Sequence, residues 1–469
     1  MSKYIINFVI ISALITIQTN SQSGFDNYLQ KDSLYRFNSS LKVIDSLLTA
    51  QTRESLKDTA FYNSYGKSEV FTLNQLLFAA VNNNPELIAM QTKIDVSNSQ
   101  AEGKSYLPDP MFEFELDDIM SDFSRVGMIN FYVSQMFPFP GKLALQKQSV
   151  LNSKAMMQSE RLGMAIDIMN MIKMEYYDLY LLNNKIQINN DNRLLIKTFI
   201  AAAEAQYMVG KGMQQEVFKS QIEMSRLENE DFILKQQRKN IFSELTKLTK
   251  IVVDENTRII FADINNEYLL DEASFNVNLS KTEKLIDYAF EHRPDIKTLK
   301  NKIIMNQTDL DMAKIERLPD LNIKLGYKIL PFEEKNAFAF MVGVNIPFAP
   351  WSSGKYDHAV KRNEVIIRST TDELGAKKND IRNEVTTIVN NMVSLKETMR
   401  FYYGVQLPQT ENTMKSAQYS YETNMGGFLD LLDAYRMYQE SRIMYYESVT
   451  MYLKMIAELE KATGLNLKN

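Results

Sequence analysis

The sequence contains no cysteine and only two histidines among its 469 residues. Without thiols it can form no disulfide, no thiolate metal site and no cysteine nucleophile. The two histidines, His292 and His358, leave little material for a zinc-hydrolase site or for a histidine general base. We therefore expect no catalytic, cofactor-binding or metal-ligating residues. His292, at a helix boundary, is interpreted as structural, and His358, near the start of a long helix, has no nearby ligand partner in the sequence.

Glycine (16 residues) and proline (11 residues) are scarce for a chain of this length. Because these residues interrupt helices, their scarcity favours long uninterrupted helices. Beyond the N-terminus, no segment approaches the roughly 20 consecutive apolar residues that a membrane-spanning helix needs. The net charge of -5 gives no electrostatic reason to expect a nucleic-acid partner.

The N-terminus predicts export. Lys3 supplies a basic start, Ile5–Ile17 is a mostly apolar stretch, and small polar residues follow up to Ser23. This order is typical of a cleaved signal peptide, which we assign to residues 1–23. Residues 24–68 form an N-terminal extension to which no role is assigned. An exported chain without a membrane helix is periplasmic, secreted or a β-barrel.

Three landmarks occur twice in the same order, about 210 residues apart. They are Asn84-Pro85-Glu86-Leu87 and Arg293-Pro294-Asp295-Ile296, Leu107-Pro108-Asp109 and Leu318-Pro319-Asp320, and Tyr207-Met208-Val209-Gly210 and Tyr421-Glu422-Thr423-Asn424. A shared order predicts a tandem duplication, with a first repeat over 69–280 and a second over 281–469. Each copy is expected to contain a short helix, a longer helix begun by proline, two strands, and two long helices joined by a tight turn.

Four segments show strict alternation of apolar and polar residues, the period of a β-strand with one apolar face. The apolar positions are Phe112, Phe114 and Leu116; Ile129, Phe131 and Val133; Leu321, Ile323, Leu325, Tyr327 and Ile329; and Phe338, Phe340, Val342, Val344 and Ile346. Alternation fits both a soluble sandwich and an outer-membrane barrel. Four strands cannot close a barrel alone, so a membrane barrel would have to be shared by several protomers.

A very long helix is predicted to follow the first pair of strands. Residues 141–208 contain no proline and one interior glycine, Gly163, which allows a helix of about 100 Å. Its apolar residues recur at steps of three and four, as in coiled coils: Leu162, Ile166, Met169, Ile172, Tyr176, Leu179, Leu182 and Ile186. The stretch from Lys355 to Leu407 also lacks proline and predicts a second such helix.

The junction between the first strand pair and the long helix carries the most specific motif. It consists of Gln135, Phe137, Pro138, Phe139, Pro140, Gly141 and Lys142. The prolines stop the strand and the glycine permits a sharp turn. Together with the order of the other motifs from Phe71 to Leu465, this run resembles the TolC-like outer-membrane efflux protein family, especially its heavy-metal cation branch. The second copy carries the looser Ile346-Pro347-Phe348, with Gly354-Lys355 at the corresponding position.

The resemblance implies a mainly α fold with a membrane β-barrel portion. Each protomer would combine long coiled-coil helices with four strands, and a homotrimer would share one 12-stranded barrel set in outer-membrane lipid. An α-helical tunnel would continue into the periplasm, with Ile251–Ser280 in a belt around it. The absence of cysteine departs from relatives that carry a lipidated N-terminal cysteine.

The turns of the two helical hairpins are the candidate docking sites that the resemblance implies. They comprise Val209, Gly210, Lys211 and Gly212 in the first hairpin, and Asn424, Met425, Gly426 and Gly427 in the second. In relatives such tips meet a periplasmic adaptor, which works with an inner-membrane pump, here expected to be of the resistance-nodulation-division type. Asn424 replaces a common glycine but tolerates the same left-handed turn. The plain alternative is that these residues only turn the chain.

Two other clusters could be interpreted as sites. Six methionines, at positions 156, 157, 164, 169, 171 and 174, could bind Cu(I), but packing is favoured because several of them alternate with the apolar seam. Glu113, Glu115, Asp117 and Asp118 could form a catalytic or calcium site, but their alternation favours a solvated lumen or loop face.

We therefore predict a passive duct for the export of small solutes, with heavy-metal cations favoured over drugs only by the motif resemblance. One alternative is a periplasmic coiled-coil adaptor or structural envelope protein with a small soluble sandwich. Another is an exported enzyme acting on envelope polymers, for which the sequence offers no convergent set of catalytic residues.

Overall fold

The computed structural model describes residues 70–119, 126–261, 264, 279–331, 335–347, 349–423 and 425–464. This part of the chain is mainly helical, with one four-stranded antiparallel sheet and a two-stranded parallel ladder. The predicted signal peptide, the N-terminal extension, Asn424, and much of the predicted belt lie outside the described residues. None of the described helices combines the length and apolar character that crossing a lipid bilayer requires.

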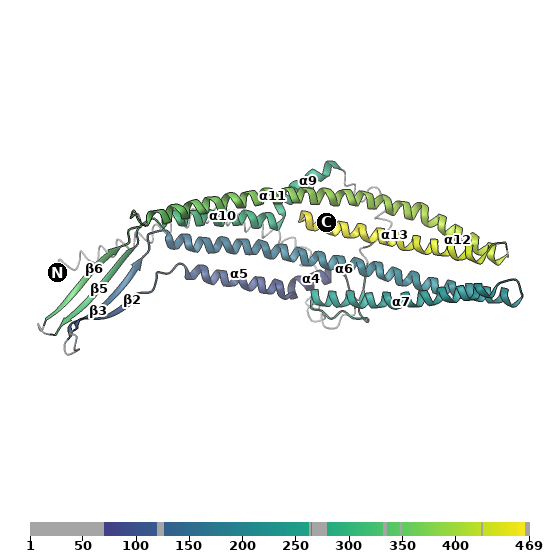
Figure 1. Cartoon of the computed structure of the whole chain (residues 1–469), viewed down its shortest axis with the longest axis horizontal. Helices are drawn as coiled ribbons and strands as arrows, with labels where there is room; N and C mark the ends of the chain where they lie inside the picture. The colour runs from purple at the N-terminus through teal and green to yellow at the C-terminus, as the bar shows by residue number, and fades with distance from the viewer. Residues whose placement is uncertain are drawn as a thin grey trace, which may run out of the picture. The chain divides into compact units, whose positions relative to one another are not determined.

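Both halves of the chain present a similar order of elements (Figure 1). The elements are β1 (Val70–Phe71), α4 (Leu73–Asn83), α5 (Pro85–Gly103), β2 (Met111–Ile119), β3 (Val126–Phe137), α6 (Lys142–Met208), α7 (Gln214–Thr249), β4 (Arg258–Ile259), α9 (Leu279–His292), α10 (Pro294–Ile315), β5 (Leu321–Leu330), β6 (Lys335–Val344), α11 (Ser353–Phe401), a π-helical turn (Tyr402–Gln406), α12 (Leu407–Glu422) and α13 (Phe428–Thr463). The four predicted strands and the long helices are confirmed.

The described residues form two compact units. The sheet unit combines Lys93–Met156 with Lys300–Asp372, and the helical unit combines Ser68–Thr92, Met157–Leu299 and Glu373–Asn469. Helices α5, α6, α10 and α11 have residues in both units. Each unit therefore draws on both halves of the chain, and the division into repeats at residue 280 remains a prediction.

The sheet has the strand order β2-β3-β5-β6, so its central pair joins the two halves of the chain. All three pairings are antiparallel. Phe114 stands opposite Phe131, which stands opposite Tyr327, and Tyr327 in turn stands opposite Phe338. This row of aromatic residues crosses all four strands on the same face, because residues directly opposite each other in a sheet share a face.

The sheet exposes its apolar face and buries part of its polar face, the reverse of a sheet in a soluble protein. The side chain of Phe338 is 88% exposed, whereas Asn130 is 1% and Ser134 is 5% exposed. Exposed residues on the apolar face are Phe112, Phe114, Leu116, Val133, Leu321, Leu325, Phe338, Phe340, Val342 and Val344. Within the described residues no second sheet or helix covers this face.

Tyr132 and Gly326 fit together on the polar face. They stand opposite each other on β3 and β5, and a Cβ at Gly326 would lie 2.6 Å from the Tyr132 ring. Only glycine therefore lets this ring lie across the neighbouring strand. The ammonium group of Lys324 lies 4.4 Å from the centre of the same ring and also pairs with Glu113.

The helical segments of the sheet unit contact one another through polar side chains. Asn152 of α6 donates to the hydroxyl of Thr308 on α10 at 2.8 Å, and Asn306 donates to Thr370 on α11 at 3.0 Å. All four residues are buried. Since a buried polar group is costly unless it is hydrogen-bonded, these bonds specify which helix faces meet.

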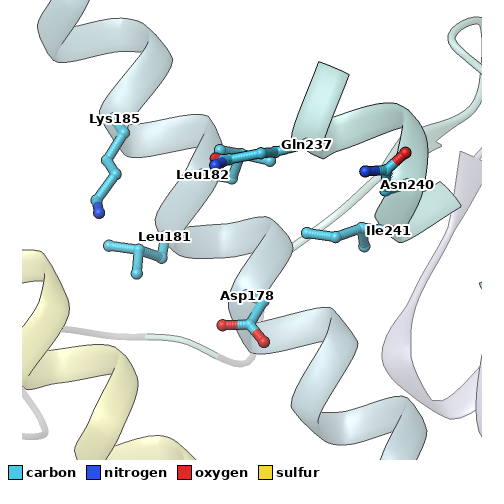
Figure 2. Close-up of a pocket in the computed structure, with 7 residues that line it drawn as sticks. All are labelled: Asp178, Leu181, Leu182, Lys185, Gln237, Asn240 and Ile241. Carbon is cyan, nitrogen blue, oxygen red and sulfur yellow. The ribbon is translucent and has the colours of Figure 1, made fainter. Parts of the chain in front are cut away.

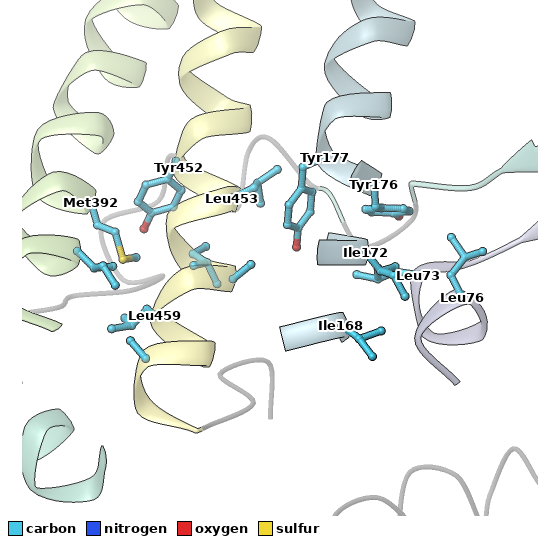
Figure 3. Close-up of a cluster of buried hydrophobic side chains, with 14 of the residues drawn as sticks. Leu73, Leu76, Ile168, Ile172, Tyr176, Tyr177, Met392, Tyr452, Leu453 and Leu459 are labelled. Carbon is cyan, nitrogen blue, oxygen red and sulfur yellow. The ribbon is translucent and has the colours of Figure 1, made fainter. Parts of the chain in front are cut away.

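The core of the helical unit lies between α4, α6, α11 and α13, with further residues from α7 and α9 (Figure 3). Ile172, Tyr176, Leu179 and Leu182 of the predicted seam are buried, whereas Ile166 and Met169 are only half-buried. Tyr176 and Tyr177 are both buried although they are adjacent. Helix α6 therefore packs over a broad arc, not along the narrow stripe that a simple coiled coil requires.

The six methionines between positions 156 and 174 of α6 do not form one cluster. Met164 and Met174 pack against the core of the helical unit, whereas Met171 is exposed. The other three, Met156, Met157 and Met169, are half-buried. Methionine fits such uneven contacts because its side chain is unbranched and adaptable.

Arg293 begins the landmark Arg293-Pro294-Asp295-Ile296 and joins three helices of the helical unit. Its guanidinium contacts Asp295 of α10 at 2.8 Å, Glu384 of α11 at 2.6 Å and the carbonyl oxygen of Ala462 on α13 at 3.0 Å. Burial would raise the pKa of Asp295, but the bonds and charges of Arg293 and Lys377 outweigh it and lower that pKa. The adjacent His292 stacks on Tyr288 with ring centres 3.7 Å apart, so its role here is structural.

The second long helix is interrupted where the sequence predicts it to end. Helix α11 stops at Phe401, the π-helical turn covers Tyr402–Gln406, and α12 begins at Leu407 with Pro408 in its first turn. Proline has no N–H group and its ring crowds the preceding helical turn. The wider π-helical turn accommodates Pro408 without ending the helix altogether.

Candidate functional site

The first hairpin turn lies in the helical unit and closes α6 with a left-handed glycine. Gly210 has φ +73°, and its N–H donates to the carbonyl oxygen of Tyr207 at 3.0 Å. The next N–H, of Lys211, reaches back to the carbonyl oxygen of Gln206 at 2.9 Å. This pair of bonds is a Schellman motif, which satisfies carbonyl groups left free at a helix end.

The two hairpin turns share a pair of hydrogen bonds to one carbonyl group. In the first turn, the N–H groups of Lys211 and Gly212 both donate to the carbonyl oxygen of Gln206. In the second turn, the N–H groups of Met425 and Gly426 both donate to the carbonyl oxygen of Ser420. The bonds that flank position 424 thus match those that flank Gly210, while Asn424 itself lies outside the described residues.

Glycine is favoured at positions 212 and 426 because each residue lies against the helix that it closes. A Cβ at Gly212 would lie 3.0 Å from the Cβ of Gln206, and one at Gly426 would lie 2.9 Å from the Cβ of Ser420. Gly427 is the N-cap residue of α13, and its N–H donates to the carboxylate of Asp430 at 3.3 Å. The turn residues identified from sequence therefore have a geometric role, and a docking role remains a separate proposal.

Both turns present apolar side chains to solvent. Met208, Val209 and Met213 are exposed in the first turn, and Met425 is 87% exposed in the second. Lys211 is also exposed. An apolar patch of this kind is typical of a surface that binds another protein.

Tyr421 joins the two hairpins next to their turns. Its hydroxyl donates to the carboxylate of Glu216 on α7 at 3.2 Å, and its carbonyl oxygen accepts a bond from the side chain of Gln206 at 3.2 Å. Its ring packs on Phe428 with centres 5.6 Å apart. Burial, with Glu216 nearby, raises the pKa of Tyr421 to about 12, so the hydroxyl remains a donor at neutral pH.

A buried carboxylate forms a second link between the hairpins, and sequence reasoning missed it. The side chain of Glu223 on α7 is 1% exposed. It accepts bonds from Arg226 at 2.7 Å and from Arg436 of α13 at 2.8 Å. Burial alone would raise the pKa of Glu223, but the two guanidinium groups outweigh it and lower that pKa. The spacing of Glu223 and Arg226 hints at a local pair, but nothing in the sequence indicates the third member.

A hollow of about 310 Å³ lies between α6 and α7 (Figure 2). It is lined by Asp178, Leu181, Leu182, Lys185, Gln237, Asn240 and Ile241. Its two charged side chains are already paired with α13, Asp178 with Lys454 at 2.6 Å and Lys185 with Glu447 at 2.7 Å. The hollow therefore offers no free charge for an ionic ligand.

The strand-to-helix motif, from Gln135 to Lys142, lies in the sheet unit at the end of β3. The strand ends at Phe137, directly before Pro138, as predicted. Gly141 has φ +98°, which lets α6 begin at Lys142. A Cβ at Gly141 would also lie 3.1 Å from the side chain of Ile315.

The motif is bonded to the Leu-Pro-Asp landmark of the other half of the chain. The buried Lys142 donates from Nζ to Asp320 Oδ1 at 2.7 Å and to the carbonyl oxygen of Leu318 at 2.9 Å. The N–H of Phe139 reaches the same carboxylate oxygen at 2.8 Å. The side chain of Gln135 donates to the carbonyl oxygen of Pro108 at 2.8 Å. The bonds to Leu318 and Asp320 hold the end of the β3 and β5 pair closed, and the bond from Gln135 joins β3 to the segment before β2.

The acidic residues of β2 serve the sheet. Glu113 pairs with Lys324, and Glu115 accepts a bond from Asn130 at 3.4 Å, across the polar face. The side chain of Asp118 lies outside the described residues. No group of three or more histidine, cysteine or acidic side chains among the described residues is placed to hold a metal ion.

Replacing Gly210 tests the geometry of the first turn. Gly210→Ala is expected to destabilise the protein by about 1 kcal/mol because a Cβ is unfavourable at positive φ. Gly210→Asn, which copies the residue at position 424, should destabilise it less. The measurement is thermal unfolding followed by circular dichroism. Gly375→Ala is the control: it lies within α11 with open space around it and should be neutral or stabilising. Equal losses of stability for the alanine and asparagine variants would contradict the left-handed conformation assigned to Gly210.

Replacing Glu223 tests the buried link between the hairpins. Glu223→Gln is expected to cost about 1–3 kcal/mol of unfolding free energy because two arginines lose their carboxylate. The folded-state pKa of Glu223 lies below its ordinary value of 4.5, so its contribution is complete above that pH and is lost as pH falls through the lowered pKa. The variant should therefore lose less stability than the wild type between about pH 5 and pH 3.

The control for this experiment is Glu230→Gln. Glu230 also faces Arg226, at 3.4 Å, but is more exposed, so its loss should be below about 1 kcal/mol. Parallel pH profiles for the wild type and Glu223→Gln would rule out an ionised, stabilising Glu223.

No protein-family model matches this chain. Among curated proteins, the cobalt-zinc-cadmium resistance protein CzcC of Cupriavidus metallidurans is 18% identical over 375 residues, covering 80% of this chain and 85% of that protein. At this identity the similarity supports a shared fold.

Solved outer-membrane channels share the fold. The outer-membrane channel OprN has a TM-score of 0.69 at 12% identity, covering 84% of this chain and 90% of its own. CusC has a TM-score of 0.69 at 14% identity, with 84% and 92% covered. VceC of Vibrio cholerae has a TM-score of 0.67 at 14% identity, with 84% and 97% covered. The resemblance seen in the sequence motifs is thereby confirmed: the chain has the fold of the TolC-like outer-membrane efflux channels.

Proposed function

We propose that this protein is the outer-membrane channel of a tripartite efflux system, a passive duct through which small solutes leave the cell. The observation that carries the proposal is the sheet with an exposed apolar face and a partly buried polar face. Such a sheet suits lipid on one side and a water-filled lumen on the other. OprN and CusC, which share this fold, are channel proteins, and this agrees with a duct and not an enzyme.

The proposed assembly is a homotrimer. Strands β2 and β6 are the edges of the four-stranded sheet. In lipid, the free N–H and C=O groups of an edge have no water to bind, so the sheet has to close on itself. Three copies supply twelve strands, and barrels of this order enclose an aqueous channel. The apolar face would then contact outer-membrane lipid, and the helical hairpins would form a tunnel in the periplasm.

The hairpin turns are the proposed docking surface for a periplasmic adaptor. The surface consists of Val209–Gly212 and of residues 424–427. Its support is the exposed apolar patch around Val209 and Met425 on a rigid turn. An inner-membrane pump, of the resistance-nodulation-division type by resemblance, would supply the energy and most of the selectivity, because a passive duct selects little by itself.

Heavy-metal cations are the proposed cargo. The name of the curated relative includes resistance to cobalt, zinc and cadmium. The polar face of the sheet carries carboxylates at Glu113, Glu115 and Asp117 with lysines at Lys324 and Lys328. This mixture of charges suits ions in transit and does not build a tight binding site.

A soluble adaptor or structural protein would have to hide the apolar face of the sheet. Phe112, Phe338 and Phe340 are exposed, and no described element covers them. A patch of this kind on a soluble protein would promote aggregation. We therefore do not retain the soluble sandwich as a second function.

Two neighbouring positions of β6 test the membrane assignment. Phe340→Lys places a charge on the proposed lipid face, where it should cost about 2–4 kcal/mol and strongly reduce the amount of assembled protein in the outer membrane. Ala339→Lys places the same charge on the polar face and should be tolerated. The measurement is membrane fractionation followed by native electrophoresis in detergent. Equal tolerance of both variants, or a soluble monomer without detergent, would refute the proposal.

Deletion of the gene tests the cargo. The deletion strain should become more sensitive to cobalt, zinc or cadmium salts, and the wild-type gene should restore growth. A variant with both turns replaced by flexible Gly-Ser residues should assemble in the membrane but fail to restore growth, because it loses the proposed adaptor surface. Unchanged growth on all three metals would exclude metal export, while the membrane experiment would still decide whether the protein is a channel.

A further inference from the structure

The bonds at the junction of β3 and β5 provide a template for the contact between copies. At that junction Lys142 is buried and bonded to Asp320. The corresponding residues on the outer strands are Lys355, after β6, and Asp109, before β2. Both are exposed, and neither forms an ion pair with another residue in the described part of the chain. The chain thus contains the same pair twice, once joined and once apart.

The two unpaired residues lie at the two free edges of the sheet. Asp109 precedes β2 as Asp320 precedes β5, with the same Leu-Pro-Asp sequence. Lys355 lies in the first turn of α11, and Lys142 opens α6. Within one chain, β2 and β6 are separated by two strands, which places them about 14 Å apart. A second copy is therefore required to bring these edges together.

The β3 and β5 pair also specifies a register. Phe137, directly before Pro138, stands opposite Leu321, directly after Asp320. Applied to the outer edges, the same rule sets Ile346, directly before Pro347, opposite Pro110, directly after Asp109. Antiparallel pairing then sets Val344 opposite Phe112, Val342 opposite Phe114 and Phe340 opposite Leu116.

This register keeps the two faces of the sheet intact across the junction. The apolar residues Phe112, Phe114 and Leu116 meet valine or phenylalanine, and on the other face Glu113 meets Gly343. A slip by one residue would set Phe114 against Met341 or Gly343, and would place polar residues on the apolar face. The register was derived from the β3 and β5 junction alone. That it also sets apolar residues opposite apolar residues is therefore independent support for it.

We propose that each copy joins the next through β6 and β2 in this register, and that the junction is closed by an ion pair between Lys355 of one copy and Asp109 of the next. The proposal rests on the proposed function, since only a shared barrel brings these edges together. Each edge pairs with a second copy of this chain. The β6 edge of one copy matches the β2 edge of the next in the order of apolar and polar residues, in register, and in the opposite charges of Lys355 and Asp109.

The absence of native cysteine makes disulfide formation a direct test of the register. Phe114→Cys with Val342→Cys, and Glu113→Cys with Gly343→Cys, place cysteines in two neighbouring rows. One of these rows is a non-hydrogen-bonded pair, whose side chains lie closer together. Mild oxidation of the assembled protein should yield covalent dimers and trimers on non-reducing gels. A disulfide within one chain is excluded, because Cα atoms more than about 7 Å apart cannot be bridged.

The matched controls shift one cysteine by two residues. Phe114→Cys with Phe340→Cys, and Phe114→Cys with Val344→Cys, stay on the same face but lie diagonally, about 7–8 Å apart, and should link poorly. Stronger linking of a shifted pair would overturn the register. Trimers in detergent without linking of any pair would overturn the proposed junction while leaving the channel intact. Monomers in detergent would overturn the proposed function itself.

The ion pair is tested by exchanging its charges. Asp109→Lys and Lys355→Asp should each lower the temperature at which detergent-solubilised trimers dissociate, because each variant sets like charges together. The double variant Asp109→Lys with Lys355→Asp should recover most of the loss. No recovery in the double variant, with normal assembly of both single variants, would show that the two residues do not meet.

Discussion

The rest of the structure depends on a sheet that one chain cannot complete. Its apolar face is uncovered and both of its edges are free within the described residues. In water this face would be a large exposed patch, and in lipid the edges would leave hydrogen-bonding groups unsatisfied. In the proposed assembly, lipid covers the apolar face and further copies of the chain pair with the edges. One constraint therefore accounts for both the proposed location and the proposed oligomer.

In the helical unit, polar contacts hold the two long helical hairpins in register. Apolar burial alone specifies register weakly, because leucine or methionine fits many neighbours. Polar contacts are more specific: Tyr421 bonds to Glu216, and Glu223 bonds to Arg226 and Arg436. A buried carboxylate with two guanidinium partners allows few alternative arrangements. The turns add a second constraint, since Gly212 and Gly426 each lie against the helix that they close.

Structural features that depend on residues close together in the sequence could be predicted. Alternation located all four strands, and the scarcity of proline and glycine predicted the length of α6. The end of β3 before Pro138 and the turn at Gly210 followed from backbone chemistry that involves neighbouring residues only. The resemblance to outer-membrane efflux channels rested on such local motifs in a common order.

Features that join distant residues could not be predicted. Arg436, the second partner of Glu223, lies 213 residues from it, and Asp320 lies 178 residues from Lys142. No periodic pattern relates these residues. The coiled-coil-like spacing of α6 identified several buried residues, but it could not show that Tyr176 and Tyr177 are both buried because this helix packs over a broad arc. The π-helical turn was missed because Pro408 indicated the end of a helix, and the chain instead widens locally.

The two free edges also have a genetic consequence. In a closed ring of three copies every chain contributes one β2 edge and one β6 edge, so each contact is heterologous and each copy takes part in two contacts. A single copy with a damaged edge would leave the whole ring open. When intact and damaged chains are made in the same cell and mix at random, the share of closed channels falls as the cube of the intact fraction. Edge mutations would therefore be dominant, whereas mutations that prevent folding altogether would be recessive.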